Sequence, residues 1–135
     1  MRVVFDTNIF ISALVIQGPR AEKAIFRILE DKDVLFLSKS IIDEVLSVMS
    51  AKFSRDREAI SHVAVYLSEL GQTIETGKRI SIFKDEPDNR ILECAVSGNA
   101  DAVVTGDKEM LSLGEYQGIK IITLDQYLPG TPLFL

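Results

Sequence analysis

Arg2-Val3-Val4-Phe5-Asp6-Thr7-Asn8 is a run of β-branched and aromatic residues that stops at a carboxylate. An apolar run without polar alternation is typical of a strand that is covered on both faces of a parallel sheet. Three further runs have the same form and also end in polar residues: 34–37 before Ser38, 102–105 before Gly106 and Asp107, and 119–124 before Asp125. We therefore predict four buried strands.

Segments with helical periodicity separate these runs. They cover residues 20–31, 39–53, 55–70 and 87–97, with a further short helix before residue 119. The first places Leu29 on one apolar stripe with Ile25 and Ile28, and the last two end at Gly71 and Gly98, as expected of helix C-caps. Residues 73–84 are ambiguous, with one or two short extended pieces. The alternation predicts a single domain over residues 1–135, an α/β/α three-layer sandwich with a mainly parallel sheet.

Parallel sheets bind ligands beyond the carboxyl ends of their strands. This rule predicts that Asp6, Ser38 and Asp107 lie along one edge of the sheet. Asp101 starts its strand, so we expect it at the opposite edge, in a structural hydrogen bond.

Two more carboxylates are placed by helical angle, at roughly 100° per residue. Glu44 falls at the margin of the apolar sector of helix 39–53, whereas Asp43 lies on the polar face. Asp88 aligns with Ile91 and Leu92, so it should lie at the N-terminal end of a buried stripe, with Asp85 as the N-cap.

The four acids Asp6, Glu44, Asp88 and Asp107 are thus expected to converge without any His or Cys. Oxygen-only ligands favour hard cations, above all Mg²⁺ or Mn²⁺. Without a metal, such carboxylates repel one another and some take up protons. One ion, or a pair roughly 3.5–4 Å apart, would activate water and stabilise charge on a phosphoryl oxygen.

Composition limits the possible partners. The 135 residues are 47% hydrophobic and 26% charged, which is typical of a globular domain and argues against disorder. A net charge of -5 opposes broad binding to nucleic acid, so such a role requires a local basic patch or a bound metal. The single Cys94, the absence of a signal-peptide pattern and the shortness of the apolar runs predict a cytoplasmic protein with no membrane span.

Four segments together resemble the PIN domain nucleases, in order and spacing, over nearly the whole chain. They are residues 5–8, 37–44, 85–92 and 100–107. The resemblance implies a PIN-like fold and a Mg²⁺- or Mn²⁺-dependent endoribonuclease that cuts RNA. It further implies a homodimer and the toxin of a VapC-type toxin–antitoxin pair, with an antitoxin protein as partner.

The resemblance also assigns residues. Asp6, Glu44, Asp88 and Asp107 match the family's four acids, and Asn8 and Thr105 match polar residues that support the first and last of them. Ser38 either contacts metal-bound water or caps its helix. The basic residues available to contact RNA are Arg90, Lys108, Lys52 and Arg55.

Each acid also has a purely structural interpretation. Asp6 and Asp107 favour turns, Glu44 is compatible with a solvated helix face, and Asp88 would stabilise the helix dipole from its first turn. The alternative functions are a catalytically silent PIN-like module that binds proteins and another acidic α/β phosphoryl hydrolase. A dehalogenase-type phosphatase would need a second Asp where Asn8 stands, and a response-regulator receiver would need paired acids and a late Lys.

Overall fold

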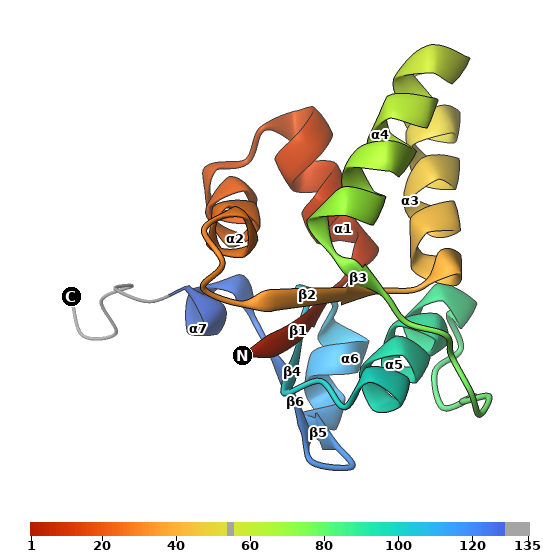
Figure 1. Ribbon diagram of the computed structural model, residues 1–135. Coiled ribbons are helices and arrows are strands. Elements are labelled where there is room, and N and C mark those ends of the chain that lie inside the picture. Colours follow the sequence, from red (N-terminus) through yellow and green to blue (C-terminus); the bar gives the residue numbers. More distant parts are fainter. Residues whose placement is uncertain (54–55, 129–135) are drawn as a thin grey trace.

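One mixed sheet forms the centre of the protein in the computed structural model, which describes residues 1–53 and 56–128 (Figure 1). The strand order within this part of the chain is β3-β2-β1-β4-β6-β5. All neighbours run parallel except β5, which is antiparallel to β6. The strands are β1 (Arg2–Phe5), β2 (Val34–Leu37), β3 (Gln72–Thr73), β4 (Ala102–Val104), β5 (Glu115–Tyr116) and β6 (Ile119–Ile122).

Helices cover both faces of this sheet. Their bounds are α1 (Thr7–Ile11), the π-helical turn η1 (Ser12–Ile16), α2 (Pro19–Leu29), α3 (Lys39–Lys52), α4 (Arg57–Leu70), α5 (Glu86–Gly98), α6 (Lys108–Leu113) and α7 (Leu124–Tyr127). Right-handed crossovers place α1 to α4 on one face and α5 and α6 on the other (Figure 1). The predicted three-layer α/β/α architecture is therefore confirmed.

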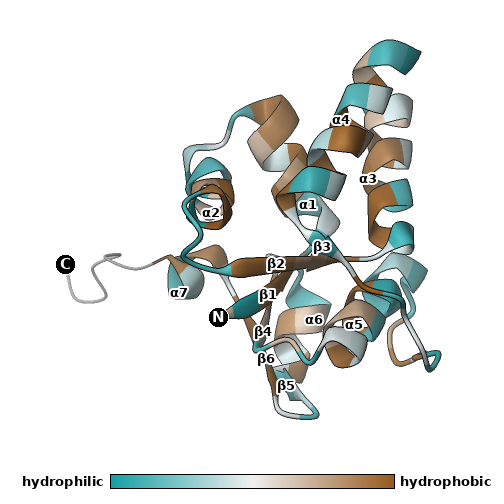
Figure 2. Ribbon diagram, in the orientation of Figure 1, coloured by the Kyte–Doolittle hydropathy of each residue, from teal (hydrophilic) through white to brown (hydrophobic). Residues whose placement is uncertain are grey.

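The strands supply the centre of the apolar core. Figure 2 shows β1 and β2 hydrophobic along most of their length, whereas the helices are apolar on one side and polar on the other. Val3, Val4 and Phe5 have no exposed surface, as expected of a strand covered on both faces. Within residues 1–53 and 56–128, every helix is too short or too polar to cross a membrane.

Several predicted boundaries are wrong for identifiable reasons. The run from Ile119 extends only to Ile122, because Thr123 caps α7 and Leu124 begins that helix. Residues 7–16, for which no helix was predicted, form α1 and η1, since Asp6 caps a helix directly after β1. Helix α5 includes Gly98 and ends in the left-handed Asn99 (φ 53°), so Asn99 takes the role expected of glycine.

The apolar stripe of α2 is narrower than predicted. Ile25 and Ile28 are buried, but Leu29 is 52% exposed at the end of the helix. Arg55, the first residue of the predicted third helix, lies outside the described residues, and α4 begins at Arg57.

A polar cluster fastens the amino-terminal edge of the sheet. Buried Asp33 accepts hydrogen bonds from the Met1 ammonium at 2.7 Å, Arg27 Nε at 2.8 Å and the Tyr127 hydroxyl at 2.6 Å. Burial alone raises the pKa of Asp33, but these three donors more than offset it, and the pKa lies below its ordinary value. At the same edge Asp101 accepts from the backbone N–H of Arg2 at 2.7 Å, which confirms the structural role predicted for it.

We expect Tyr127→Phe to lower the free energy of unfolding by about 1–3 kcal/mol at pH 7, because a buried hydrogen bond to a charged group is lost. Because the pKa of Asp33 is lowered in the folded state, the ionised carboxylate stabilises the fold at pH values above the ordinary pKa of Asp. This contribution disappears as the pH falls through the lowered pKa. The cost of the substitution should therefore shrink below about pH 4. Urea titrations at pH 3.5 and pH 7 measure it, with Tyr116→Phe as control; equal costs for the two variants at pH 7 would contradict the assignment.

Candidate active site

Asp6 is held at the carboxyl end of β1 by hydrogen bonds of its backbone and its side chain. Its backbone N–H donates to Val104 O at 3.0 Å, which continues the β1–β4 pairing beyond Phe5. Its Oδ2 accepts a 2.6 Å hydrogen bond from the Thr105 hydroxyl, and its Oδ1 accepts from Asn8 N at 3.4 Å as the cap of α1. The side chain is buried, with 6% of the residue exposed, so its orientation is fixed by these contacts.

Asp107 is connected to Asp6 by hydrogen bonds that both residues make with Thr105. The Asp107 N–H donates to Thr105 Oγ1 at 3.0 Å, so this hydroxyl accepts from one candidate acid while it donates to the other. Asp107 Oδ1 accepts from Met110 N at 3.0 Å and caps α6. Asp107 can therefore cap α6 and still contribute to the site, since the cap uses only one of its two carboxylate oxygens.

Asp88 supplies the third carboxylate, from helix α5. It lies in the first turn of α5, is 6% exposed, and its Oδ2 has no hydrogen-bond partner among the described residues. Burial and the charges of Asp107, Asp85, Asp6 and Glu109 raise the pKa of Asp88 to about 7. Burial, with a contribution from Asp107, also raises the pKa of Asp6. The structure thus brings three of the predicted acids within electrostatic reach of one another.

Glu44 occupies a different position. Its charge is not among the leading causes of the raised pKa of Asp88 or Asp6. It lines an adjoining pocket of about 290 Å³ between α1, α3 and α5, and shares this pocket with Arg90. Asp43 is exposed and paired with Lys39 at 2.7 Å, as the helical angle predicts.

The predicted supporting residues divide into two groups. Thr105 contacts both Asp6 and Asp107 and is fully buried. Ser38 caps α3, accepting from Ile41 N at 3.2 Å, which is the structural alternative stated for it. Asn8 is exposed and reaches Asp6 through its backbone N–H.

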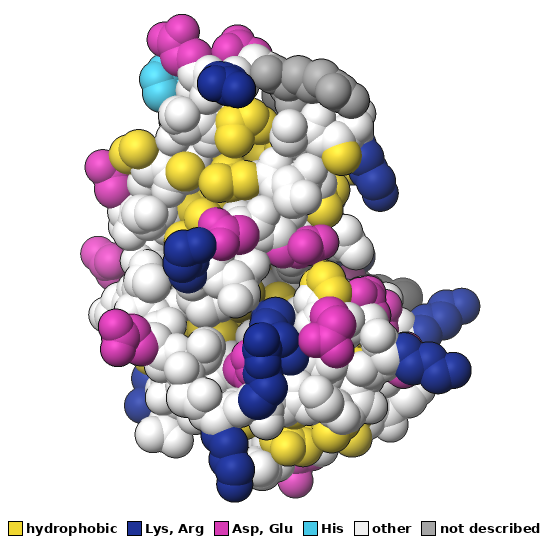
Figure 3. Space-filling model, turned by 90° about the vertical axis from the view of Figure 1, so that its right-hand side faces the viewer, with side chains coloured by type: hydrophobic (Ala, Val, Ile, Leu, Met, Phe, Trp, Pro, Cys, Tyr) yellow, Lys and Arg dark blue, Asp and Glu magenta, His cyan; other side chains and the backbone are white. Residues whose placement is uncertain are grey.

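Three of the four basic residues proposed for RNA contact are described, and each lies on a different helix. Lys108 is exposed next to Asp107, and Arg90 forms a wall of the pocket. Lys52 is exposed at the far end of α3, about 20 Å along the helix from Ser38. Arg55 lies outside the described residues. Figure 3, which views the side of α3 and α5, shows acidic and basic side chains interleaved across the middle of the molecule, with apolar ones gathered above them.

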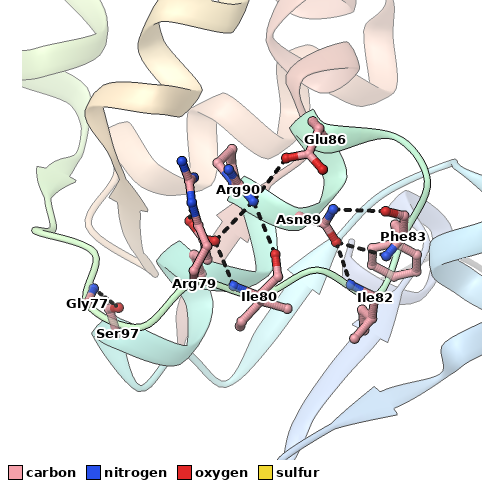
Figure 4. Close-up of polar contacts among 10 residues, drawn as sticks. Gly77, Arg79, Ile80, Ile82, Phe83, Glu86, Asn89, Arg90 and Ser97 are labelled. Atoms are coloured by element: carbon pink, nitrogen blue, oxygen red, sulfur yellow. Dashed lines mark hydrogen bonds and ion pairs between the residues drawn. The ribbon is translucent and has the colours of Figure 1, made fainter.

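One face of α5 holds the segment 77–83, which lies between β3 and α5 (Figure 4). Asn89 accepts from Ile82 N and Phe83 N at 3.0 and 2.8 Å and donates to Phe83 O at 2.9 Å. Glu93, 4% exposed, accepts from Ile80 N at 2.8 Å. These buried side chains take the place of strand partners for an irregular backbone, so the segment is fixed against the helix that carries Asp88.

Sequence reasoning missed two acids near the site. Glu109, in the first turn of α6, was not considered, although its spacing from Asp107 was a usable signal. Asp85 stands at the N-cap position of α5, as predicted, but its side chain makes no capping hydrogen bond, and its charge acts on Asp88 instead. Neither His62, which is exposed, nor Cys94, whose buried thiol has its pKa raised to about 12, provides a nucleophile.

A hard cation fits this donor set. Within residues 1–53 and 56–128, no three Asp, Glu, His or Cys side chains are already arranged as ligands around one point. The unpartnered Asp88 Oδ2 and the mutual repulsion of three carboxylates are nevertheless what a divalent ion would relieve. The donors are all oxygen, which suits Mg²⁺ or Mn²⁺ better than zinc or copper.

The protein is thus an α/β sandwich with a mainly parallel sheet, and it carries a cluster of carboxylates at the carboxyl edge of that sheet. The family model described as PIN domain matches residues 2–109. The chain therefore belongs to the PIN domain family, as its motifs suggest.

Known proteins resemble this chain in sequence and in fold. The uncharacterized protein MJ1680 of Methanocaldococcus jannaschii is 30% identical over 140 residues, covering the whole of this chain and 90% of that protein. A chain in the crystal structure of VapBC2 from Rickettsia felis, bound to a promoter DNA fragment, has a TM-score of 0.67 at 14% identity; the match covers 91% of this chain and 98% of that one. A chain of VapBC-1 from nontypeable Haemophilus influenzae has a TM-score of 0.63 at 19% identity, with coverage of 92% and 98%. These two structures share the fold.

We expect Asp88→Asn to stabilise the metal-free protein at pH 8. Because the folded-state pKa of Asp88 is raised, wild-type stability should fall as the pH rises through about 4 to 7, and the variant lacks this loss. After allowance for the lost helix-dipole interaction, the gain should be about 1–2 kcal/mol at pH 8 and close to zero at pH 4. Urea unfolding in EDTA tests it, with exposed Asp43→Asn as control; a loss of stability at pH 8 would show that burial does not strain this carboxylate.

Asn89→Ala should destabilise the protein by about 2–4 kcal/mol, because three hydrogen bonds are lost and the N–H groups of Ile82 and Phe83, the latter buried, have no replacement. Ser97→Ala removes one exposed bond, to Gly77 N, and should cost less than about 1 kcal/mol. Hydrogen exchange at the amides of Ile82 and Phe83 should accelerate in Asn89→Ala alone. Unchanged exchange would mean that Asn89 does not fix this segment.

Proposed function

We propose that this chain is a Mg²⁺- or Mn²⁺-dependent endoribonuclease. The observation that carries the proposal is the group Asp6, Asp88 and Asp107. Asp6 and Asp88 are buried, one buried oxygen of Asp88 has no partner among the described residues, and mutual repulsion contributes to the raised pKa of Asp88. Such an arrangement costs stability and is retained where a cation is to be bound. Membership of the PIN domain family supports the assignment to nucleases.

The residues of this chain divide the work. Thr105 orients Asp6, the α6 cap orients Asp107, and the first turn of α5 carries Asp88. Glu44 would contribute directly or through water from the wall of the adjoining pocket. One or two bound ions would supply an activated water and charge stabilisation at the phosphoryl group. Lys108 and Arg90, next to Asp107 and in the pocket wall, are the candidates for phosphate contact.

We further propose that the protein is the toxin of a toxin–antitoxin pair and forms a homodimer. The support is the likeness in fold to chains of two VapBC structures and the resemblance of the motifs to VapC-type proteins. Co-purification with the product of the neighbouring reading frame tests the pairing. Light scattering tests the dimer.

We expect Asp6→Asn to lower RNA cleavage by more than about 100-fold, since even outer-shell partners of a metal site are worth roughly 10–100-fold. Thr105→Val, which removes the hydroxyl between Asp6 and Asp107, should cost about 10–100-fold. Wild-type activity should vanish in EDTA and return with Mn²⁺.

Asp43→Asn is the matched control, an exposed aspartate on α3 whose loss should leave cleavage unchanged. Full activity in chelator, or in the Asp6 variant, would refute the metal-dependent assignment. Absence of Mn²⁺ binding by calorimetry would favour the alternative of a catalytically silent interaction module.

A further inference from the structure

Arg90 is held in the pocket wall through one of its nitrogen atoms. Its Nη2 donates to Ile80 O at 3.1 Å and forms ion pairs with Glu93 at 3.1 Å and Glu86 at 3.2 Å. Its Nε is buried and has no partner among the described residues. The side chain is only 14% exposed, so the guanidinium is already positioned before any ligand arrives (Figure 4).

The two carboxylates that pair with Arg90 differ in burial. The Glu93 side chain is 5% exposed and is fixed by Ile80 N as well as by Arg90. The Glu86 side chain is 66% exposed, lines the same pocket, and lies one helical turn before Arg90. An exposed ion pair of this kind contributes little to stability, whereas a buried one is costly to break. Glu86 is therefore the partner that an incoming anion can replace.

The pocket lies next to the acid site in the chain as well as in space. Thr7 follows Asp6, Pro87 precedes Asp88, and both line the pocket with Arg90 and Glu86. A phosphate group at Arg90 would consequently be close to the carboxylates proposed to carry the reaction. A guanidinium group binds the oxygens of a phosphate in the same way as it binds those of a carboxylate. A phosphate of the RNA backbone therefore competes with Glu86 for Arg90.

We propose that Arg90 is the phosphate-binding residue of the pocket and that Glu86 is a displaceable counter-ion, which occupies the phosphate position until RNA enters. Glu93 and Ile80 O keep the guanidinium in place during the exchange. The inference rests on the proposed RNA substrate. In this arrangement Glu86 competes with RNA for Arg90, so removal of the Glu86 charge should strengthen RNA binding.

The test is the affinity for a fluorescein-labelled 12-nucleotide single-stranded RNA, measured by anisotropy from 25 to 300 mM salt. Ca²⁺ replaces Mg²⁺, and a gel confirms that the strand is intact. Glu86→Gln should bind about 2- to 5-fold more tightly at low salt, the range expected when an exposed competing pair is removed. Arg90→Gln should bind more weakly, with a salt slope smaller by about 0.7, as for one phosphate contact.

Glu58→Gln is the matched control, because Glu58 is also an exposed glutamate in a first helical turn, at the start of α4. Its effect on affinity should be at least 2-fold smaller, and Glu86→Gln should have no effect in an Arg90→Gln background. Equal effects of the two glutamate variants, an undiminished effect without Arg90, or no RNA binding by wild type and Glu86→Gln would overturn the inference. Should Arg90→Gln fail to fold, the comparison of Glu86→Gln with Glu58→Gln decides alone. Cleavage is scored separately, so an inactive protein that shows the binding pattern would refute hydrolysis and leave the inference standing.

Discussion

The Thr105 hydroxyl connects the two strand ends on which the candidate site depends. A hydroxyl has one hydrogen, and Thr105 gives it to Asp6 Oδ2 while its oxygen accepts from the backbone of Asp107. Phe5 pairs with Val104 in the parallel register, so both strands stop at the same level and each delivers its acid to the same place. The proximity of Asp6 and Asp107 is thus a consequence of sheet pairing, and the threonine converts proximity into fixed orientation.

The two edges of the sheet treat buried carboxylates in opposite ways. At the amino-terminal edge, Asp33 receives three donors, two of them cationic, and its pKa is lowered. At the carboxyl edge, Asp6 and Asp88 are buried near other acids, and the pKa of each is raised. A protein selected for stability alone would pair these acids as it pairs Asp33. The unequal treatment supports the carboxyl edge as the candidate functional end of the sheet, without reference to any relative.

The sequence is sufficient for the four buried strands, the layer order and the edge at which Asp6 and Asp107 meet, because apolar runs and parallel topology are local or general rules. The short strands β3 and β5 were not predicted, because two residues each are too few to show a pattern. Helical angle also placed Asp88 correctly on a buried face. It could not show that Glu44 lines a pocket with Arg90, since this depends on how α3 packs against α5. The roles of Asn89 and Glu93 were equally hidden, because their partners are backbone groups of an irregular segment whose path only tertiary packing determines.

Under the proposed function, the charges along α5 would determine how an acidic protein approaches RNA. The net charge is -5, and Arg90, the basic residue in the pocket wall, is already paired with two glutamates. Under the proposed function, two divalent ions would add about four positive charges at the site and bring the total to roughly -1. The first attraction for a phosphate backbone then comes from the loaded site. Arg90 acts at short range, after the exposed carboxylate of Glu86 has been displaced, so that ion loading controls encounter and the pocket controls the position of the strand.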